Sequence, residues 1–172
     1  MINNFKDFHM PRYDEIPDID LYMDQLLVYI DKVLLPFSTT HQEKFLTTSM
    51  VNNYVKQGLL PPTVKKRYAR EHVARLIEIC IAKQVHSITE ISRLLDVQNA
   101  LFDIETAYNY ICTELENVLK STFSNEPLPE DSAISTQDAR LLVRHTTIAF
   151  AYKLYIHQLC DALYEQHVDK NN

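Results

Sequence analysis

The chain has 172 residues, 46% of them hydrophobic, and a net charge of −6, so it is long enough to bury a sizeable core. Its single glycine excludes the glycine-rich loops that cradle phosphates and argues against tight β-hairpins, which favours a mainly helical protein. No apolar run approaches the ~20 residues that cross a membrane, and the N-terminal MINNFKDFHM lacks the apolar stretch of a signal peptide, so we expect a cytoplasmic protein without membrane contact.

Three parts of the chain differ in pattern. Residues 1–19 contain Pro11 and Pro17 and predict an N-terminal arm that is either poorly ordered or draped over the body. Residues 20–96 predict a DNA-binding domain of short helices, and residues 97–172 predict a helical dimerisation or effector region. The first predicted helix runs from Asp20 to Leu35, and the proline that follows ends it.

Residues 47–57 predict a second helix, with Thr47 or Thr48 as its N-cap and Gly58 at its C-terminal stop. Helical spacing places an apolar stripe inward and a polar face outward. The outward residues are Ser49, Asn52, Asn53 and Lys56. Asparagine can pair with adenine through two hydrogen bonds, and lysine can bind guanine or phosphate oxygens. The alternative is a helix face that is simply solvated.

A basic stretch surrounds this helix. Residues 44–75 carry seven of the basic side chains against one acid, Glu71, a local charge of +6 that leaves −12 for the rest of the chain. A basic patch on an acidic body is typical of a DNA-binding protein, although a solvated run of charges is the alternative.

Residues 61–68 predict a stiff arm, because two successive prolines precede Lys65-Lys66-Arg67-Tyr68 in an extended conformation. Such an arm reaches phosphates at little entropic cost. We expect phosphate contacts from five cations: Lys56, Lys65, Lys66, Arg67 and Arg70. Tyr68 either packs the arm onto the body or touches the DNA backbone through its hydroxyl.

Two more helices follow. Residues 70–83 predict a helix whose apolar face includes Cys80, which indicates a buried structural thiol. Ser87 and Glu90 have the spacing of a capping box and begin the next short helix.

Two long helices are predicted after residue 97. A heptad seam covers the first, with members Leu101, Ile104, Tyr108, Ile111, Leu115 and Val118. The proline-containing NEPLPED ends it, and Ser135 with Asp138 is expected to cap a last helix of about thirty residues. Its apolar stripe comprises Leu141, Leu142, His145, Ile148, Ala149, Tyr152, Tyr155, Ile156, Leu159 and Leu163. We expect an antiparallel pair whose remaining apolar surface pairs with a second chain, the alternative being a closed intrachain bundle with the 20–35 helix.

Metal binding and catalysis have little support. His157 and Cys160 lie one helical turn apart, but spacing supplies no third ligand, and the three cysteines, Cys80, Cys112 and Cys160, show no CxxC pattern. An odd, sparse set of this kind is typical of buried free thiols in a reducing cytoplasm. HExxH and GxSxG motifs are absent from the sequence. We expect no enzyme activity, no metal site and no cofactor.

The stretch from residue 47 to residue 95 contains a set of short motifs in a fixed order. They are Tyr54, Gly58-Leu59-Leu60-Pro61, Lys66-Arg67-Tyr68, Glu71, Leu76, Ile79 and Ser87-Ile88-Thr89-Glu90-Ile91. On these motifs the stretch resembles the MerR-type winged helix-turn-helix. In more detail, MVNNYVKQGLLPP and KKRYAREHVARLI resemble a bacterial family of unknown function (number eighteen thirty-six), over residues 20 to about 160.

The resemblance implies an all-α (mainly) fold: a MerR-like winged helix-turn-helix with an appended long-helix C-terminal region. It also implies a cytoplasmic transcriptional regulator without a known effector. Metal sensing near the dimer helix of MerR-like proteins draws attention to Cys112 and Cys160. Three departures stand out. Asn52 occupies a position where the MerR pattern has arginine, the wing is short and lacks glycine, and the first helix ends about ten residues early. Either residues 40–45 form a short first helix or the turn is expanded.

Together these patterns predict a homodimeric regulator that binds double-stranded DNA and pairs through its C-terminal helices. Its expected DNA-binding residues are Thr48, Ser49, Asn52, Asn53, Lys56, Lys65, Lys66, Arg67, Tyr68 and Arg70. The alternative is a helical protein–protein interaction adaptor that uses the same basic patch for an acidic partner. The sequence indicates neither an operator nor a direction of regulation.

Overall fold

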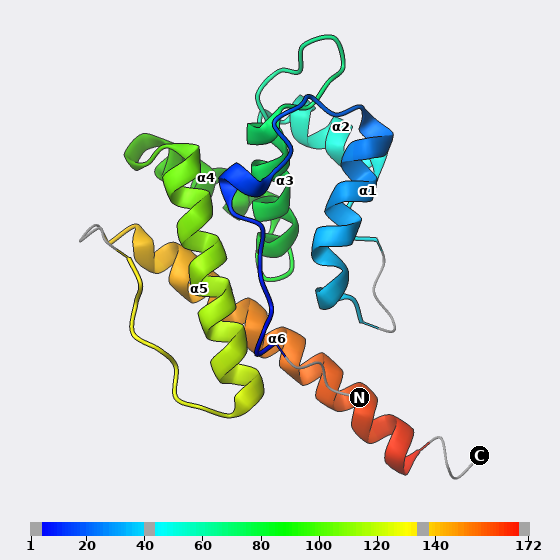
Figure 1. Ribbon diagram of the computed structural model, residues 1–172, viewed down its shortest axis with the longest axis vertical. Coiled ribbons are helices and arrows are strands. Elements are labelled where there is room, and N and C mark those ends of the chain that lie inside the picture. The colour runs from blue at the N-terminus through cyan, green and yellow to red at the C-terminus, as the bar shows by residue number, and fades with distance from the viewer. Residues whose placement is uncertain (1–4, 40–43, 134–137, 169–172) are drawn as a thin grey trace.

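The computed structural model describes residues 5–39, 44–133 and 138–168. Over these ranges the chain is mainly helical (Figure 1). Its β-type backbone pairing in the same ranges consists of two isolated bridges. The helices are α1 (Met23–Leu34), α2 (Thr48–Lys56), α3 (Arg70–Ala82), α4 (Ile88–Leu101), α5 (Ile104–Ser124) and α6 (Arg140–His167), with single 3-10 turns at Tyr13–Glu15 and Leu35–Phe37. The prediction of an all-α protein is confirmed.

Helix α3 is the centre of the fold. Every residue from His72 to Ile81 is buried, because α1 packs on one side of the helix and α5 and α6 pack on another (Figure 1). A helix that is covered all round needs apolar side chains in nearly every position, as the run Leu76–Ile81 supplies apart from Glu78. One hydrophobic core therefore joins the N-terminal arm, the short helices and the two long ones.

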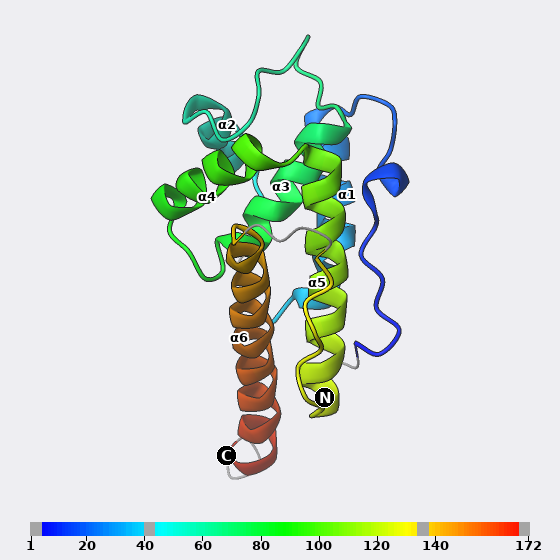
Figure 2. The same cartoon turned by 90° about the vertical axis from the view of Figure 1, so that its left-hand side faces the viewer.

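Helix α2 begins and ends as its sequence predicts. The Thr47 hydroxyl accepts a hydrogen bond from the Met50 amide at 3.3 Å, and Gly58 adopts a φ of +75°, which glycine tolerates without strain. The Leu59 amide then donates to the Tyr54 carbonyl at 2.9 Å. Two views place α2 and the loop after it at one end of the molecule, opposite the C-terminal end of α6 (Figures 1 and 2).

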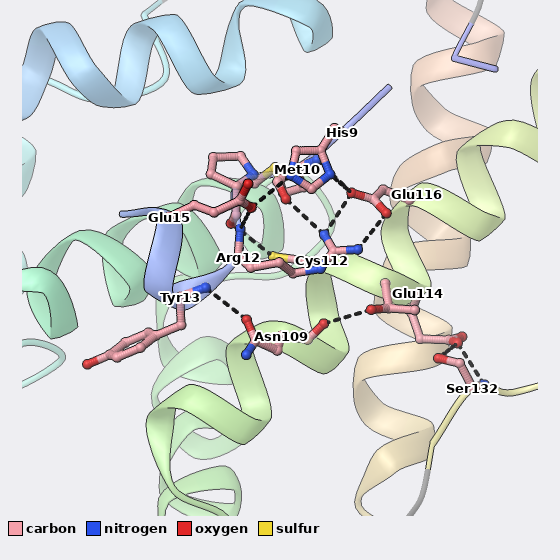
Figure 3. Close-up of polar contacts among 12 residues, drawn as sticks. His9, Met10, Arg12, Tyr13, Glu15, Asn109, Cys112, Glu114, Glu116 and Ser132 are labelled. Atoms are coloured by element: carbon pink, nitrogen blue, oxygen red, sulfur yellow. Dashed lines mark hydrogen bonds and ion pairs between the residues drawn. The ribbon is translucent and has the colours of Figure 1, made fainter. Parts of the chain in front are cut away.

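The N-terminal arm is draped along α5 over residues 5–18. Arg12 forms two hydrogen bonds of 2.7 Å with the carboxylate of Glu116, and the Met10 amide donates to the same carboxylate at 2.7 Å (Figure 3). The Tyr13 amide donates to Asn109 Oδ1 at 2.8 Å. Burial alone would raise the pKa of Glu116, but these hydrogen bonds outweigh it and hold that pKa below its ordinary value.

Helices α5 and α6 run parallel, so the predicted antiparallel pair is wrong. Their contacts advance together along both helices, from Tyr110 with Arg140, to Glu114 with Arg144, to Phe123 with Tyr155. An antiparallel pair would reverse that order. Figure 2 shows the connection returning along α5 before α6 begins.

The connection between the two helices makes the parallel arrangement possible. Asn125 ends α5 in a left-handed conformation, with a φ of 55°. The chain then runs back alongside the helix, where Glu114 Oε1 accepts a hydrogen bond from the Ser132 amide at 2.9 Å. The 21 residues of α5 span about 31 Å, whereas a dozen extended residues can span about 40 Å. A short loop would have forced the antiparallel arrangement.

The predicted heptad seam is interrupted at its start. Leu101 is the last residue of α4 and is exposed, while the seam from Ile104 onward lies on α5. Asp103 separates the two helices, because its carboxylate accepts a hydrogen bond from the Thr106 amide at 2.8 Å and caps α5.

The most buried apolar residues of α6 lie outside its predicted stripe. Phe150, Ala151 and Leu154 reach the core, whereas Tyr152 and Ile156 of the predicted stripe are exposed. The helix begins at Arg140 with Ala139 as its N-cap residue, and the predicted Ser135 cap lies outside the described residues. The alternative of a bundle closed by the first helix does not describe this packing, since α1 packs against α3.

The predicted short first helix at residues 40–45 lies largely outside the described residues, and residues 44–47 are not helical. The segment that precedes α2 is held by residues at the C-terminal end of α3. The Lys83 ammonium and the Cys80 thiol both donate to the Phe45 carbonyl, and Phe45 itself is buried. Helix α3 thus fixes the entry into α2.

Candidate nucleic-acid interface

Helix α2 presents the polar face that its sequence predicts. Its buried residues are Val51 and Tyr54, which turns the opposite side of the helix to solvent. The exposed residues on that side are Thr48, Ser49, Asn52, Asn53 and Lys56. The structure therefore brings together five of the predicted DNA-binding residues on one accessible helix face.

The predicted extended arm is instead a tight turn at Val64–Arg67. The Arg67 amide donates to the Val64 carbonyl at 3.0 Å, and the two residues form an isolated antiparallel bridge. Lys65 and Lys66 lie between them with φ values of 52° and 58°. Two successive residues with positive φ are typical of a type I′ turn, where asparagine and glycine are preferred. The chain reverses here, so both lysines occupy the exposed tip of the turn.

Tyr68 fixes this turn to the body. Its backbone exchanges two hydrogen bonds of 2.9 Å with Leu21, and its ring meets that of His72 edge-on with centroids 5.9 Å apart. The side chain is 5% exposed, and this burial raises the pKa of Tyr68. Of the two predicted roles, the packing role is the one observed, and Tyr68 is not available to touch a DNA backbone.

The two arginines near the turn differ in accessibility. Arg67 is exposed; its guanidinium lies 4.8 Å from the centre of the Tyr22 ring and donates to the Tyr22 hydroxyl at 2.7 Å. Arg70 is partly buried, and its Nε donates to the Ile16 carbonyl at 3.0 Å. Arg70 therefore holds the N-terminal arm, and only Arg67 presents its charge at the surface.

Arg75 does not belong to the basic surface, although it contributes to the local charge of residues 44–75. It is buried and forms an ion pair of 2.6 Å with Glu78. Its second amino group donates to Asn99 at 2.5 Å, and Gln98 donates to both oxygens of Glu78 at 3.2 and 3.3 Å. Burial raises the pKa of Glu78 to about 7, against the opposing effect of Arg75.

Sequence reasoning missed this cluster, in which the buried pair Arg75 and Glu78 bonds to half-buried Gln98 and exposed Asn99. The three-residue spacing of Arg75 and Glu78 on one helix was the available signal, because such residues are neighbours on a helix surface. No local signal connects Tyr22 to Arg67, since the two are brought together only by the pairing of Leu21 with Tyr68.

The thiols follow the prediction in part. Cys80 and Cys112 are buried, and burial raises the pKa of each to about 12, whereas Cys160 is exposed and contradicts the expectation of a buried thiol. Over residues 5–39, 44–133 and 138–168, no three His, Cys, Asp or Glu side chains gather in a metal-binding arrangement. None of the helices within those ranges has the length and apolar character needed to span a membrane.

Comparison with known proteins gave one result. A family model described as "Domain of unknown function (DUF1836)" matches residues 11–111, from the N-terminal arm through α4 into α5. The match thus contains α2, the turn and the whole of α3. No curated protein and no solved structure matched the chain.

Proposed function

We propose that this chain, which belongs to the DUF1836 family, binds double-stranded DNA as a transcriptional regulator. The conformation of Lys65 and Lys66 carries the proposal. A left-handed conformation costs roughly 1–2 kcal/mol for a residue with a side chain, and such strained residues gather at functional sites. Two lysines at the tip of a turn that asparagine and glycine would form at lower cost are explained by a need for positive charge there.

The ion pairs of the chain support the same conclusion. Arg12, Arg75, Arg140 and Arg144 each form an ion pair with a carboxylate in the body. In the part of the chain that the structure describes, no carboxylate pairs with Lys56, Lys65 or Lys66. Cations left exposed in this way can exchange their counterions for phosphates, which is the main source of affinity for DNA.

Helix α2 serves in this proposal as the recognition helix of a MerR-like winged helix-turn-helix, and the turn serves as a short wing. Both lie at the same end of the molecule (Figure 1). Asn52 and Asn53, with Thr48 and Ser49 beside them, would meet base edges in the major groove. The phosphate contacts would come from Lys56, Lys65, Lys66 and Arg67, while Tyr68 and Arg70 hold the turn and the arm in place.

Helix α6 supports a homodimer. Tyr152, Ile156 and Leu163 form an exposed apolar stripe along one side of the helix, whose C-terminal turns extend beyond the end of α5 (Figures 1 and 2). Pairing through this stripe would give a dimer that carries two α2 helices. A cytoplasmic location fits the free thiols Cys80 and Cys112.

The dimer is tested by sedimentation. Ile156 is 61% exposed, so Ile156→Glu should leave the fold intact and convert the dimer to a monomer. Val28→Glu, at an exposed position of α1, is the matched control and should remain dimeric. A wild-type chain that sediments as a monomer at micromolar concentration would contradict the dimer.

The DNA interface is tested by a charge-matched pair of triple variants. Replacing Lys65, Lys66 and Arg67 with alanine should weaken binding to all duplexes and reduce the salt slope by roughly 2–3 units, one for each lost phosphate contact. The control variant replaces Lys32, Arg93 and Lys120, three exposed cations on other helices, and should bind as the wild type does. Equal binding of labelled genomic duplexes by both variants would show that the turn is not the interface.

An adaptor that binds an acidic partner protein through the same cations would give a similar salt dependence. The two functions differ in their selectivity among duplexes. Genomic fragments selected by the wild-type chain should outcompete random DNA, and Asn52→Ala with Asn53→Ala should reduce that preference, with each lost base contact contributing about 1–3 kcal/mol. A chain that treats selected and random duplexes alike would support the adaptor.

A further inference from the structure

We propose that a cavity between α3, α4, α5 and α6 binds a small, mostly apolar molecule that carries no net charge and has a hydrogen-bond donor. The cavity has a volume of about 640 Å³, and small-molecule sites in proteins occupy roughly 300–1,000 Å³. It lies away from the α2 face and the turn, since none of the residues of either lines it. The inference thus goes beyond the DNA-binding proposal and does not depend on it.

The walls of the cavity define the body of the ligand. Side chains from all four helices face it, and many of them are aliphatic, such as Ile81, Leu94, Leu95, Ile111, Leu142 and Val143, with the aromatic rings of Phe102 and Tyr110 beside them. The cavity opens to solvent, since Val97 and Leu142 line it and are exposed. An apolar molecule that entered it would therefore leave water and gain hydrophobic burial.

A buried carboxylate defines the hydrogen-bonding end of the cavity. Glu78 lines the cavity and its side chain is 4% exposed. Its Oε2 accepts from Arg75 at 2.6 Å and from Gln98 at 3.3 Å, while its Oε1 accepts from Gln98 at 3.2 Å. The two oxygens of a carboxylate offer about four acceptor sites, so there is capacity for one donor from a ligand.

The charges around the Glu78 end of the cavity exclude an anionic ligand. Arg75 already balances the charge of Glu78, so an uncharged ligand meets a neutral pair. The only other charged side chain that lines the cavity among the described residues, Arg140, is held by Asp131 at 3.1 Å. An anionic group would lose its hydration inside an apolar chamber beside a carboxylate, which is strongly unfavourable.

Two dyes with one skeleton test both the cavity and the ligand class. N-phenyl-1-naphthylamine is neutral, largely aromatic and has one N–H donor, whereas 1-anilinonaphthalene-8-sulfonate adds a sulfonate. Titrations at pH 8, above the Glu78 pKa of about 7, should show saturable fluorescence, with the neutral amine binding at least tenfold more tightly. Equal or tighter binding of the sulfonate would overturn the ligand class.

Two alanine positions locate the binding. Ala82 lines the cavity at the end of α3, and Ala100 lies exposed on α4 outside the lining. Ala82→Trp should fill the space and weaken binding of the neutral amine at least tenfold, whereas Ala100→Trp should change it less than twofold. Circular dichroism checks that both variants are folded. If Ala82→Trp does not fold, Leu142→Trp, at a 42% exposed lining position, replaces it with the same expected loss.

Unchanged binding in the folded cavity variant would show that the dye lies on exposed apolar surface, such as the Tyr152 and Ile156 stripe of α6, and would overturn the proposal. The same result follows if the wild-type chain gives no saturable signal. Because fluorescence is measured without DNA, either failure leaves the DNA-binding proposal untouched.

Discussion

Lys65 and Lys66, which precede α3, and Arg75, which lies within it, have opposite surroundings. Lys65 and Lys66 stand exposed at the tip of a turn, whereas Arg75, in the second turn of the helix, is buried against Glu78. An exposed charge contributes little to stability and is available for a partner. A buried charge is tied to its partner, and its removal leaves the partner uncompensated. The first region should therefore control binding, and the second should control stability.

The largest expected effect is on the buried side of this comparison. Arg75→Ala leaves the carboxylate of Glu78 without its counter-ion and should lower the free energy of unfolding by about 3–5 kcal/mol. Urea denaturation measures it. Arg93→Ala, an exposed arginine on α4, is the control and should stay within about 0.5 kcal/mol of the wild type. Similar losses of stability in both variants would show that the buried Arg75 stabilises the fold no more than an exposed arginine does.

Glu78 should also make stability depend on pH. Its pKa is raised to about 7 in the folded chain from an ordinary value of 4.5, because burial disfavours the carboxylate. Between these two pH values the folded chain holds a proton that the unfolded chain has released, so stability should fall as pH rises, by on the order of 1–3 kcal/mol. Urea titrations from pH 4.5 to 8 measure the slope.

Glu78→Gln is the control for that slope, since it retains the shape of the side chain but not its titration. Between pH 4.5 and pH 7 the free energy of unfolding of the wild type should fall relative to that of this variant. Above pH 7 the difference between the two should stay constant. The acids with lowered pKa values, such as Glu116, have their effect at lower pH. Parallel pH profiles for the two proteins would contradict the raised pKa.

A smaller effect distinguishes α2 from α5 through their helix caps. Thr47 caps α2, and Asp103 caps α5. Replacing either with alanine should lower the free energy of unfolding by about 1 kcal/mol. Only Thr47→Ala should weaken DNA binding as well, because only α2 presents the asparagines. Thermal melts and DNA titrations of the two variants test this, and equal losses of affinity would show that α2 has no special role.

The sequence predicts the local features of this fold well. The N-cap at Thr47, the stop at Gly58 and the Ser87–Glu90 capping box each depend on neighbours within a few residues, and all three are observed. The buried thiol Cys80 follows from the period of α3 for the same reason. Such signals are readable because the responsible contacts are local.

The features that were predicted wrongly depend on contacts between residues distant in the sequence. The parallel order of α5 and α6 follows from a return chain held by Glu114, and helical periodicity says nothing about direction. The buried residues Phe150, Ala151 and Leu154 of α6 lie outside its predicted stripe, because apolar residues occur on more than one side of that helix and periodicity cannot choose between them. The turn at Lys65 and Lys66 was missed because neither residue favours positive φ, so its departure from the usual turn residues became visible only in the structure.

The most direct test of the account replaces Lys65 with asparagine and Lys66 with glycine. These residues suit a type I′ turn, so the double variant keeps the turn while it removes both charges. We predict a rise of about 1 kcal/mol in the free energy of unfolding, from relief of the left-handed conformations. We also predict weaker binding to duplex DNA, with a salt slope lower by about 2. A variant that is more stable and binds DNA with unchanged affinity and salt slope would contradict the claim that these lysines are held in strain for DNA.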